Sequence, residues 1–171
     1  EMKAVIEGFI PMYLERIAQL TNKSNQFNLT THRYTRAEIE EIAGSDAYID
    51  LYGKLEDKFG DNGVVSVVIG HKDDKVLHMD LWIMSCRVLK RDMEYAMMDT
   101  LVEKAKEAGI ETIRGYYYPT AKNKMVEDFY DKMGFTMVEK DQVGNTTWEF
   151  SIEETYQQKN QWIKVNENEQ R

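Results

Sequence analysis

The segment that most constrains the fold is the run from residue 47 to residue 86, which is typical of three strands with no helix among them. Valine, isoleucine, leucine and aromatic residues fill residues 47–55, 64–69 and 76–86. Short polar segments rich in glycine, asparagine and aspartate separate them. Because such short connections join neighbouring antiparallel strands, the run predicts an antiparallel meander.

Helical and strand-like segments alternate around this meander. The longest predicted helix spans residues 93–108, where apolar residues recur at helical spacing. Two short helices are expected earlier, one opening at Pro11 and one at a Thr35–Glu38 capping box, and a fourth helix is expected over residues 126–133. Further strands are predicted at residues 2–9, 110–118, 135–140 and 146–152.

This order of elements predicts a single α/β (α+β) domain over residues 1–152. A polar tail over residues 153–171 follows, and we expect it to fray and to be ordered in part at most. No repeat, low-complexity segment or linker divides the sequence. The expected architecture is a mixed central sheet of about seven strands, mostly antiparallel, flanked by about four helices.

Composition argues against several classes of function. The net charge is -8, with carboxylates spread through every segment, so nucleic acid and anionic membrane surfaces are poor partners. No apolar run approaches the roughly 20 residues needed to cross a bilayer, and the single cysteine rules out an internal disulfide. The histidines and the cysteine lack metal-ligand spacing, so no metal is expected. The expected compartment is a reducing cytoplasm.

Four motifs carry a resemblance to one family. They lie at residues 16–35 (RIAQLTNKSNQFNLTTHRYT), 59–63 (FGDNG), 85–89 (SCRVL) and 119–123 (PTAKN). Together they resemble the GNAT-like C-terminal domain of FkbH-like proteins. The resemblance implies the fold of the acyl-CoA N-acyltransferases, the GNAT fold, which the predicted order of elements also fits.

The resemblance also implies a parent protein and its partners. In the FkbH-like (HAD-IIIC) family a HAD-type domain carries aspartate-based phosphoryl and acyl-loading chemistry, and the GNAT-like domain follows it. This sequence holds no DxDxT-type aspartate motif, so the HAD chemistry is not assigned to it. The partner that the family implies is an acyl carrier protein or a small-molecule thioester.

The cofactor turn departs from the family pattern. GNAT enzymes hold the phosphates of acetyl-CoA, another acyl-CoA or a phosphopantetheine arm at the N-terminus of the central helix, where N–H groups favour an anion. In this sequence Lys90 and Asp92 stand where the family has glycine, and Asp92 and Glu94 would repel phosphate. The alternative is a helix N-terminus capped by its own acidic residues. The resemblance places these residues at the cofactor: Met84, Cys86, Lys90, Arg91, Asp92, Met93, Glu94 and Asn123.

A second GNAT element is better kept. Residues 123–135 resemble the helix that lies along the coenzyme, except that Val126 stands where a small residue is usual. The resemblance makes Tyr130 the catalytic residue, which donates a proton to the departing thiolate. The alternative is that Tyr130 only packs, since it shares an apolar helical stripe with Val126, Phe129 and Met133.

Candidate acceptor-binding residues lie on one strand and one loop. His78, Asp80 and Trp82 alternate along a predicted strand, so we expect them on one face, with His78 or Asp80 as base, unless that face is only solvated. The polar loop after the first helix lies where GNAT folds shape the acceptor mouth; the alternative is that its amides only tie the loop to itself. Its candidate residues are Asn28, Arg33 and Tyr34. Cys86 is expected to be a buried strand residue rather than a nucleophile.

Two functions remain open from the sequence. The first is a GNAT-like acyltransferase or acyl-thioester-binding domain, which Asn123 and Tyr130 favour. The second is a non-catalytic module that docks an acyl carrier protein for a HAD domain, which the altered glycine turn favours. We predict a sheet splayed between the strand ending at Cys86 and the strand beginning near Ile110, with unpaired backbone there to receive pantetheine amides.

Overall fold

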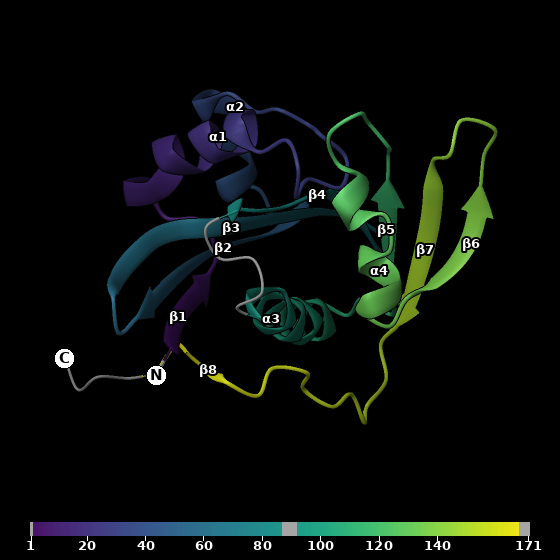
Figure 1. The fold of residues 1–171 in the computed structure, drawn as a ribbon. Coiled ribbons are helices and arrows are strands. Elements are labelled where there is room, and N and C mark those ends of the chain that lie inside the picture. Colours follow the sequence, from purple (N-terminus) through teal and green to yellow (C-terminus); the bar gives the residue numbers. More distant parts are fainter. Residues whose placement is uncertain (1, 87–91, 168–171) are drawn as a thin grey trace.

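The computed structural model describes residues 2–86 and 92–167, which form one eight-stranded sheet with helices on both faces (Figure 1). The sheet order is β6-β7-β5-β4-β3-β2-β1-β8. The strands are β1 (Met2–Glu7), β2 (Tyr48–Asp57), β3 (Gly60–Asp73), β4 (Val76–Met84), β5 (Thr112–Tyr117), β6 (Thr136–Lys140), β7 (Thr146–Ser151) and β8 (Ile163–Val165). The helices are η1 (Pro11–Tyr13), α1 (Leu14–Lys23), α2 (Arg36–Ala43), α3 (Met93–Glu107), η3 (Lys124–Val126) and α4 (Phe129–Lys132).

The predicted meander is confirmed. β2, β3 and β4 pair antiparallel in chain order, and β3 alone extends over 14 residues. Residues 64–70 of β3 are all buried, because helices cover both faces of the sheet there. The meander therefore forms the middle layer on which the rest of the molecule packs.

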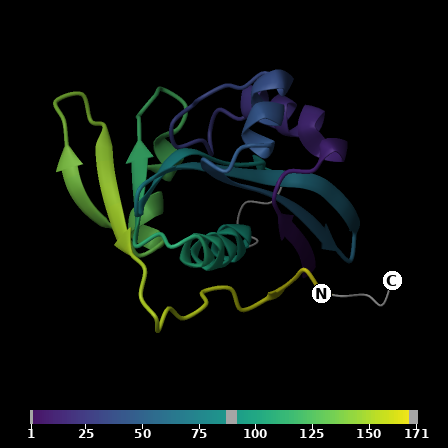
Figure 2. The ribbon, with the colours of Figure 1, turned by 180° about the vertical axis from the view of Figure 1, so that it is seen from behind.

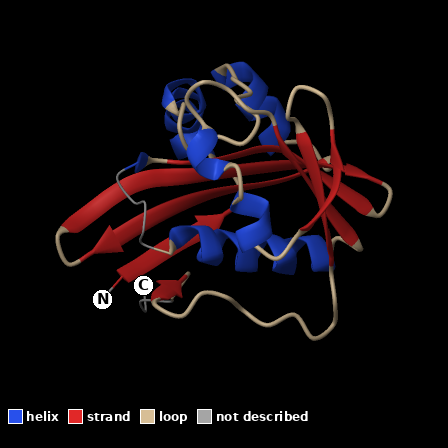
Figure 3. Cartoon of the chain, turned by 45° about the vertical axis from the view of Figure 1, so that its right-hand side comes forward, coloured by secondary structure: helices blue, strands red, loops and turns tan. Residues whose placement is uncertain are grey.

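Helices lie on opposite faces of this sheet (Figure 3), and an apolar cluster fills the space under each of them. On one face α1 and α2 pack through residues such as Ile17 against Val67 and Leu81. On the other face lies α3, which approaches β2 so closely that a Cβ atom at Gly53 would lie 2.7 Å from the sulfur of Met97. No helix in the described residues is long and apolar enough to span a membrane.

Local signals in the sequence form as expected at α2 and only in part at α4. Thr35 caps α2 in a capping box, in which its hydroxyl oxygen accepts the N–H of Glu38 at 3.1 Å. The helix predicted over residues 126–133 is interrupted between η3 and α4, because Asp128 has φ -105° and ψ 17°, outside the helical region. The predicted apolar stripe is nevertheless buried.

The C-terminal segment docks along α3 and adds a strand, where the sequence predicts a fraying tail (Figure 2). The carboxylate of Asp99 on α3 accepts hydrogen bonds from the Tyr156 hydroxyl at 2.7 Å and from the N–H groups of Lys159 and Asn160, each at 2.9 Å. Beyond these contacts, β8 pairs parallel with β1 over three residue pairs. This pairing gives the sheet one strand more than the sequence predicts.

β4 and β5 lie parallel but pair only near their first residues. Their register covers three pairs, from Val76 with Thr112 to His78 with Arg114, and the strands then diverge. The predicted splay is therefore confirmed.

Candidate active site

A short part of the loop between α1 and α2 lies in the splay, and we call residues 27–30 the inserted segment. The N–H of Met84 donates to the carbonyl oxygen of Phe27 at 3.1 Å, and the N–H of Leu29 donates to the carbonyl oxygen of Trp82 at 3.2 Å. The inserted segment thus pairs antiparallel with the edge of β4 that faces the splay. The expectation of unpaired backbone is wrong for Trp82 and Met84, because the chain itself occupies that edge.

Two asparagines hold the inserted segment, and both are 0% exposed. The Asn123 Nδ2 donates to the carbonyl oxygens of Asn28 at 2.9 Å and Tyr118 at 3.0 Å, and its Oδ1 accepts the N–H of Thr120 at 2.7 Å. The Asn28 Nδ2 donates to the carbonyl oxygen of Ser24 at 3.1 Å. Asn123 and Asn28 therefore join the loops on the two sides of the splay, and their amide groups are engaged by protein.

Tyr130 of α4 packs between β4 and β5 with a hydroxyl that has no hydrogen-bond partner among the described residues. The side chain is 1% exposed, and Gly115 of β5 makes room for it, since a Cβ atom there would lie 2.6 Å from the ring. The ring meets that of Trp82 edge-on, and the Trp82 Nε1 is likewise buried without a partner in the described part of the chain. Burial raises the pKa of Tyr130. The nearby backbone N–H of Tyr116 lowers this pKa only in part, and it does not lie in hydrogen-bond geometry to the hydroxyl. Two protonated donors therefore lie unused beside the splay.

A bulge in β4 separates residues that simple alternation would place on one face. The register of β3 and β4 shifts by one residue at Asp80, which has no partner across the ladder. Trp82 consequently belongs to the core beneath α3 and is 0% exposed, whereas His78 and Asp80 face away from that core. The expectation that Trp82 shares a face with His78 and Asp80 is wrong for this reason.

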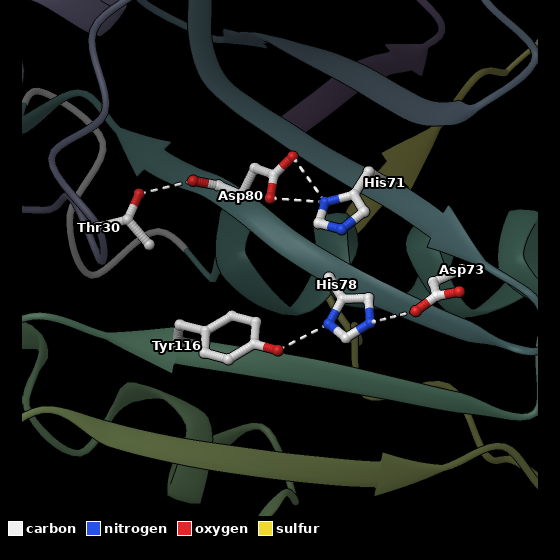
Figure 4. A network of polar contacts seen from close by, with 6 residues as sticks. All are labelled: Thr30, His71, Asp73, His78, Asp80 and Tyr116. Carbon is white, nitrogen blue, oxygen red and sulfur yellow. Dashed lines mark hydrogen bonds and ion pairs between the residues drawn. The ribbon is translucent and has the colours of Figure 1, made fainter. Parts of the chain in front are cut away.

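On that opposite face, two histidines of neighbouring strands join a polar network (Figure 4). His71 of β3 and His78 of β4 stack with ring centroids 4.8 Å apart. The Nδ1 of His71 lies 2.8 Å from Asp80 Oδ1, and the Nδ1 of His78 lies 2.6 Å from the Tyr116 hydroxyl. The Nε2 of His78 lies 3.7 Å from Asp73 Oδ2. The network therefore spans three strands at the point where β4 and β5 begin to diverge.

The protonation of this network follows from its partners. Burial lowers the pKa of His78, with the adjacent His71 adding to the effect, and burial raises the pKa of Tyr116. Tyr116 therefore donates its hydrogen bond to a neutral His78. A carboxylate only accepts, so His71 donates through Nδ1–H to Asp80. The His71 side chain is 43% exposed.

Two of the loop residues singled out from the sequence, Tyr34 and Arg33, lie in different surroundings. The Thr30 hydroxyl donates to the carbonyl oxygen of Asp80 at 2.6 Å, and burial together with the charge of Asp80 raises the pKa of Tyr34. Tyr34 therefore lies near the network. Arg33 instead donates to the carbonyl oxygen of Ser24 at 2.7 Å, so it ties the loop to the end of α1.

The N-terminus of α3 carries acidic and apolar side chains. Asp92 is its N-cap residue in the left-handed region, φ 64°, and its side chain makes no capping hydrogen bond. Met93 is fully buried, and the Glu94 carboxylate, nearly buried, lies 3.9 Å from the Lys132 ammonium. The expected self-capping therefore does not occur through Asp92. The predicted cofactor residues Lys90 and Arg91 lie outside the described residues.

The end of β4 differs from the prediction at Cys86. Met84, the last residue of the strand, is buried as expected of a core residue. Cys86 is exposed, and its thiol donates to Gln26 Oε1 at 3.2 Å. The expectation of a buried strand residue is wrong, because β4 ends at Met84.

Three residues of the network, His71, Asp73 and Tyr116, are not singled out from the sequence (Figure 4). His71 has a usable signal, since counting back from the tight turn between β3 and β4 pairs it with His78. Tyr116 has none, because no turn fixes the register between the parallel strands β4 and β5.

No family model matches the sequence, and no curated protein matches it either. Solved structures match in fold. An acetyltransferase of the GNAT family from Streptococcus pneumoniae matches with a TM-score of 0.68 at 14% identity, over 88% of this chain and 100% of that chain. Ard1 from Thermoplasma volcanium matches with a TM-score of 0.65 at 19% identity, over 88% and 99% of the two chains. The putative acetyltransferase yncA from Salmonella typhimurium, solved with its cofactor acetyl-CoA, matches with a TM-score of 0.64 at 11% identity, over 91% and 97%.

These likenesses extend over nearly the whole of each matched protein. At these identities they establish the architecture alone: the chain has the mixed α/β fold of the GNAT acetyltransferases.

Proposed function

We propose that this chain is a GNAT-type acyltransferase that binds a pantetheine thioester, carried by acetyl-CoA, another acyl-CoA or an acyl carrier protein. The observation that carries the proposal is the pair of buried donors without partners, the Tyr130 hydroxyl and the Trp82 indole N–H. Buried donors are almost always paired, so two of them beside one opening favour a ligand that brings acceptor atoms. A thioester offers a carbonyl oxygen and a sulfur.

The chemistry that suits these donors is stabilisation of developing negative charge. The acceptor nucleophile attacks the thioester carbonyl carbon, the carbon–sulfur bond breaks, and sulfur leaves as a thiolate. Because burial raises the pKa of Tyr130, full proton transfer from the phenol is costly, and its role is to donate a hydrogen bond to the sulfur. The released thiolate then takes its proton from solvent.

A base for the acceptor lies on the other face of β4. The Asp80 carboxylate accepts the Nδ1–H of His71, which leaves Nε2 to take the proton of an incoming amine or hydroxyl. The hydrogen-bond donors Tyr130 and Trp82 lie on one face of the sheet, and the base His71 lies on the other. This arrangement fits a reaction in which the thioester and the acceptor approach from opposite faces.

The parent context is also a proposal. The resemblance to FkbH-like proteins supports a role beside a HAD-type domain, with the acyl group delivered on an acyl carrier protein. This context predicts that a phosphopantetheinylated carrier protein binds more tightly than free acetyl-CoA.

The test combines binding and turnover. Calorimetric titration with acetyl-CoA and with an acylated carrier protein measures affinity, and thiol release measures transfer. We expect Tyr130→Phe to lower turnover by roughly 10- to 100-fold with little change in KM, because the lost hydrogen bond acts mainly in the transition state. The free energy of unfolding should rise by up to about 1 kcal/mol, since an unpaired buried hydroxyl is removed.

Tyr117→Phe is the matched control. Tyr117 is also buried, but its hydroxyl donates to Asn123 Oδ1 at 3.4 Å and is not one of the unpaired donors. Turnover in Tyr117→Phe should therefore match that of the native protein. Unchanged turnover in Tyr130→Phe would remove Tyr130 from the mechanism.

A second candidate function is a non-catalytic module that docks an acyl carrier protein for a HAD domain. The inserted segment favours it, because residues 27–30 occupy the β4 edge that a pantetheine arm would pair with. Carrier-protein binding without any thiol release would favour this second function over the first.

A further inference from the structure

Beyond the inserted segment, the end of β4 opens into a hollow of about 680 Å³. Phe27 and Met84 line it and also pair with each other, so the hollow adjoins the end of the splay. Its other walls are one side of α1 and the loop between β5 and η3, which contribute Arg16, Lys23 and Lys122.

The charge of this hollow is opposite to that of the protein. Arg16, Lys23 and Lys122 all line it, and none of the described lining residues is a carboxylate. Within the described part of the chain, none of these cations lies within ion-pair distance of a carboxylate. In a sequence of net charge -8, the convergence of these cations creates a local positive field.

The C-terminus of α1 does not cancel this field. Helix carbonyls there carry partial negative charge, which disfavours an anion. The Arg33 guanidinium donates to the carbonyl oxygens of Thr21, in the last turn of α1, and of its C-cap Ser24, so a cation already offsets the partial negative charge there. Arg16 and Lys23 therefore stay available to a ligand.

The alternative place for an anion is less suited. At the N-terminus of α3, Asp92 and the nearly buried Glu94 add like charge beside any phosphate. A phosphate group is therefore favoured at the hollow and disfavoured at the described start of α3.

We propose that the hollow binds the phosphoryl group of a pantetheine arm, as a phosphodiester on a carrier protein or as a phosphate ester of free phosphopantetheine or CoA. This inference rests on the proposed function for the identity of the arm. It assigns the anion of the ligand to Arg16, Lys23 and Lys122 rather than to the described start of α3, Asp92–Glu94.

The test compares pantetheine with 4′-phosphopantetheine by calorimetry at low salt. The phosphorylated compound should bind at least about tenfold more tightly, and added salt should reduce the difference. The combined change Arg16→Gln, Lys23→Gln and Lys122→Gln should abolish the difference and leave pantetheine affinity unchanged. A control that removes the same charge elsewhere, Arg36→Gln, Lys75→Gln and Lys104→Gln, should preserve it.

Inorganic phosphate locates the site without the arm. In NMR spectra, added phosphate should shift the backbone amide signals of Gln26 and Phe27 in the native protein. It should not shift them in the variant that combines the three glutamine substitutions in the hollow. Equal affinity for the two pantetheine compounds, or phosphate shifts at Asp92–Glu94 instead, would overturn the hollow as the phosphate site. Phosphate shifts at the hollow without binding of any pantetheine compound would keep the anion site and overturn the proposed acyltransferase function.

Discussion

At the scale of single residues, Asp50 of β2 makes stability depend on pH. Its Oδ1 accepts the N–H of Phe9 at 2.7 Å, yet burial raises the carboxyl pKa from 3.8 to about 6. A folded-state pKa above the unfolded value means that the folded protein binds this proton more tightly. The stabilising contribution is therefore complete below about pH 4 and is lost as the pH rises through about 6.

We therefore predict that Asp50→Asn stabilises the protein at about pH 8 by roughly 1–2 kcal/mol, because the amide keeps an acceptor oxygen for Phe9 without a buried charge. At about pH 4 the gain should vanish, since the native carboxyl is already protonated there. Urea unfolding at both pH values measures the change in the free energy of unfolding. The control is Asp46→Asn, because Asp46 is exposed. A gain of equal size at both pH values would contradict the assigned pKa.

Single-residue roles were predictable where they depend on neighbours in sequence. The capping box at Thr35 and the burial of Tyr130 follow from local pattern. The position of Trp82 does not, because a bulge at Asp80 shifts the alternation and nothing in the local sequence marks it. The resemblance assigns Asn123 to a cofactor, whereas its hydrogen bond to Asn28 depends on two loops far apart in the chain.

At the scale of elements, the inserted segment occupies the edge of β4 with which, under the proposed function, a pantetheine arm would pair. Asn28 and Ile83 face each other there as a non-hydrogen-bonded antiparallel pair, flanked by the bonds of Leu29 and Met84. The Cα atoms of such pairs lie about 4.5 Å apart, which is within the range of a disulfide. The inserted segment can therefore be locked in place.

We predict that Asn28→Cys with Ile83→Cys, in a Cys86→Ser background, binds pantetheine thioesters at least about tenfold more weakly when oxidised than when reduced. Oxidation holds the inserted segment against β4, so an arm that needs this edge cannot displace it. The reduced protein is the internal control for the loss of the Asn28 hydrogen bonds. If the oxidised form binds as well as the reduced form, the arm does not use this edge.

The elements themselves were largely predictable, because the meander, α3 and the splay depend on periodicity and short connections. The pairing of the inserted segment and of β8 was not predictable. Each pairing joins segments that are distant in sequence through backbone hydrogen bonds. Backbone hydrogen bonds do not require a periodic pattern of apolar residues, so the sequence carries no signal for them.

At the scale of the whole molecule, the C-terminal segment connects two distant parts of the structure. It leaves β7, binds Asp99 on α3 and reaches the edge of β1 (Figure 2). Removing it would take the buried Ile163 side chain out of the core. It would also leave the half-buried Asp99 carboxylate without the hydrogen bonds from Tyr156, Lys159 and Asn160.

We predict that truncation after Ile152 lowers the free energy of unfolding by on the order of 3 kcal/mol, from lost apolar burial and unpaired polar groups. Thermal and urea unfolding measure the effect, and truncation after Glu167 is the control. A truncated protein as stable as the control would show that the segment only rests on the surface.

The parallel pairing of β8 with β1 also determines how the molecule bears tension. β1 and β8 lie near the two ends of the described chain and run in the same direction, so pulling the ends apart slides one strand along the other. The bonds of Met2, Lys3 and Ala4 with β8, together with those of Asn166 to Ile6, are then loaded at the same time. A ladder loaded in this direction breaks as a unit, whereas one loaded from a single end opens bond by bond. The last strand of the chain is therefore its mechanical clamp.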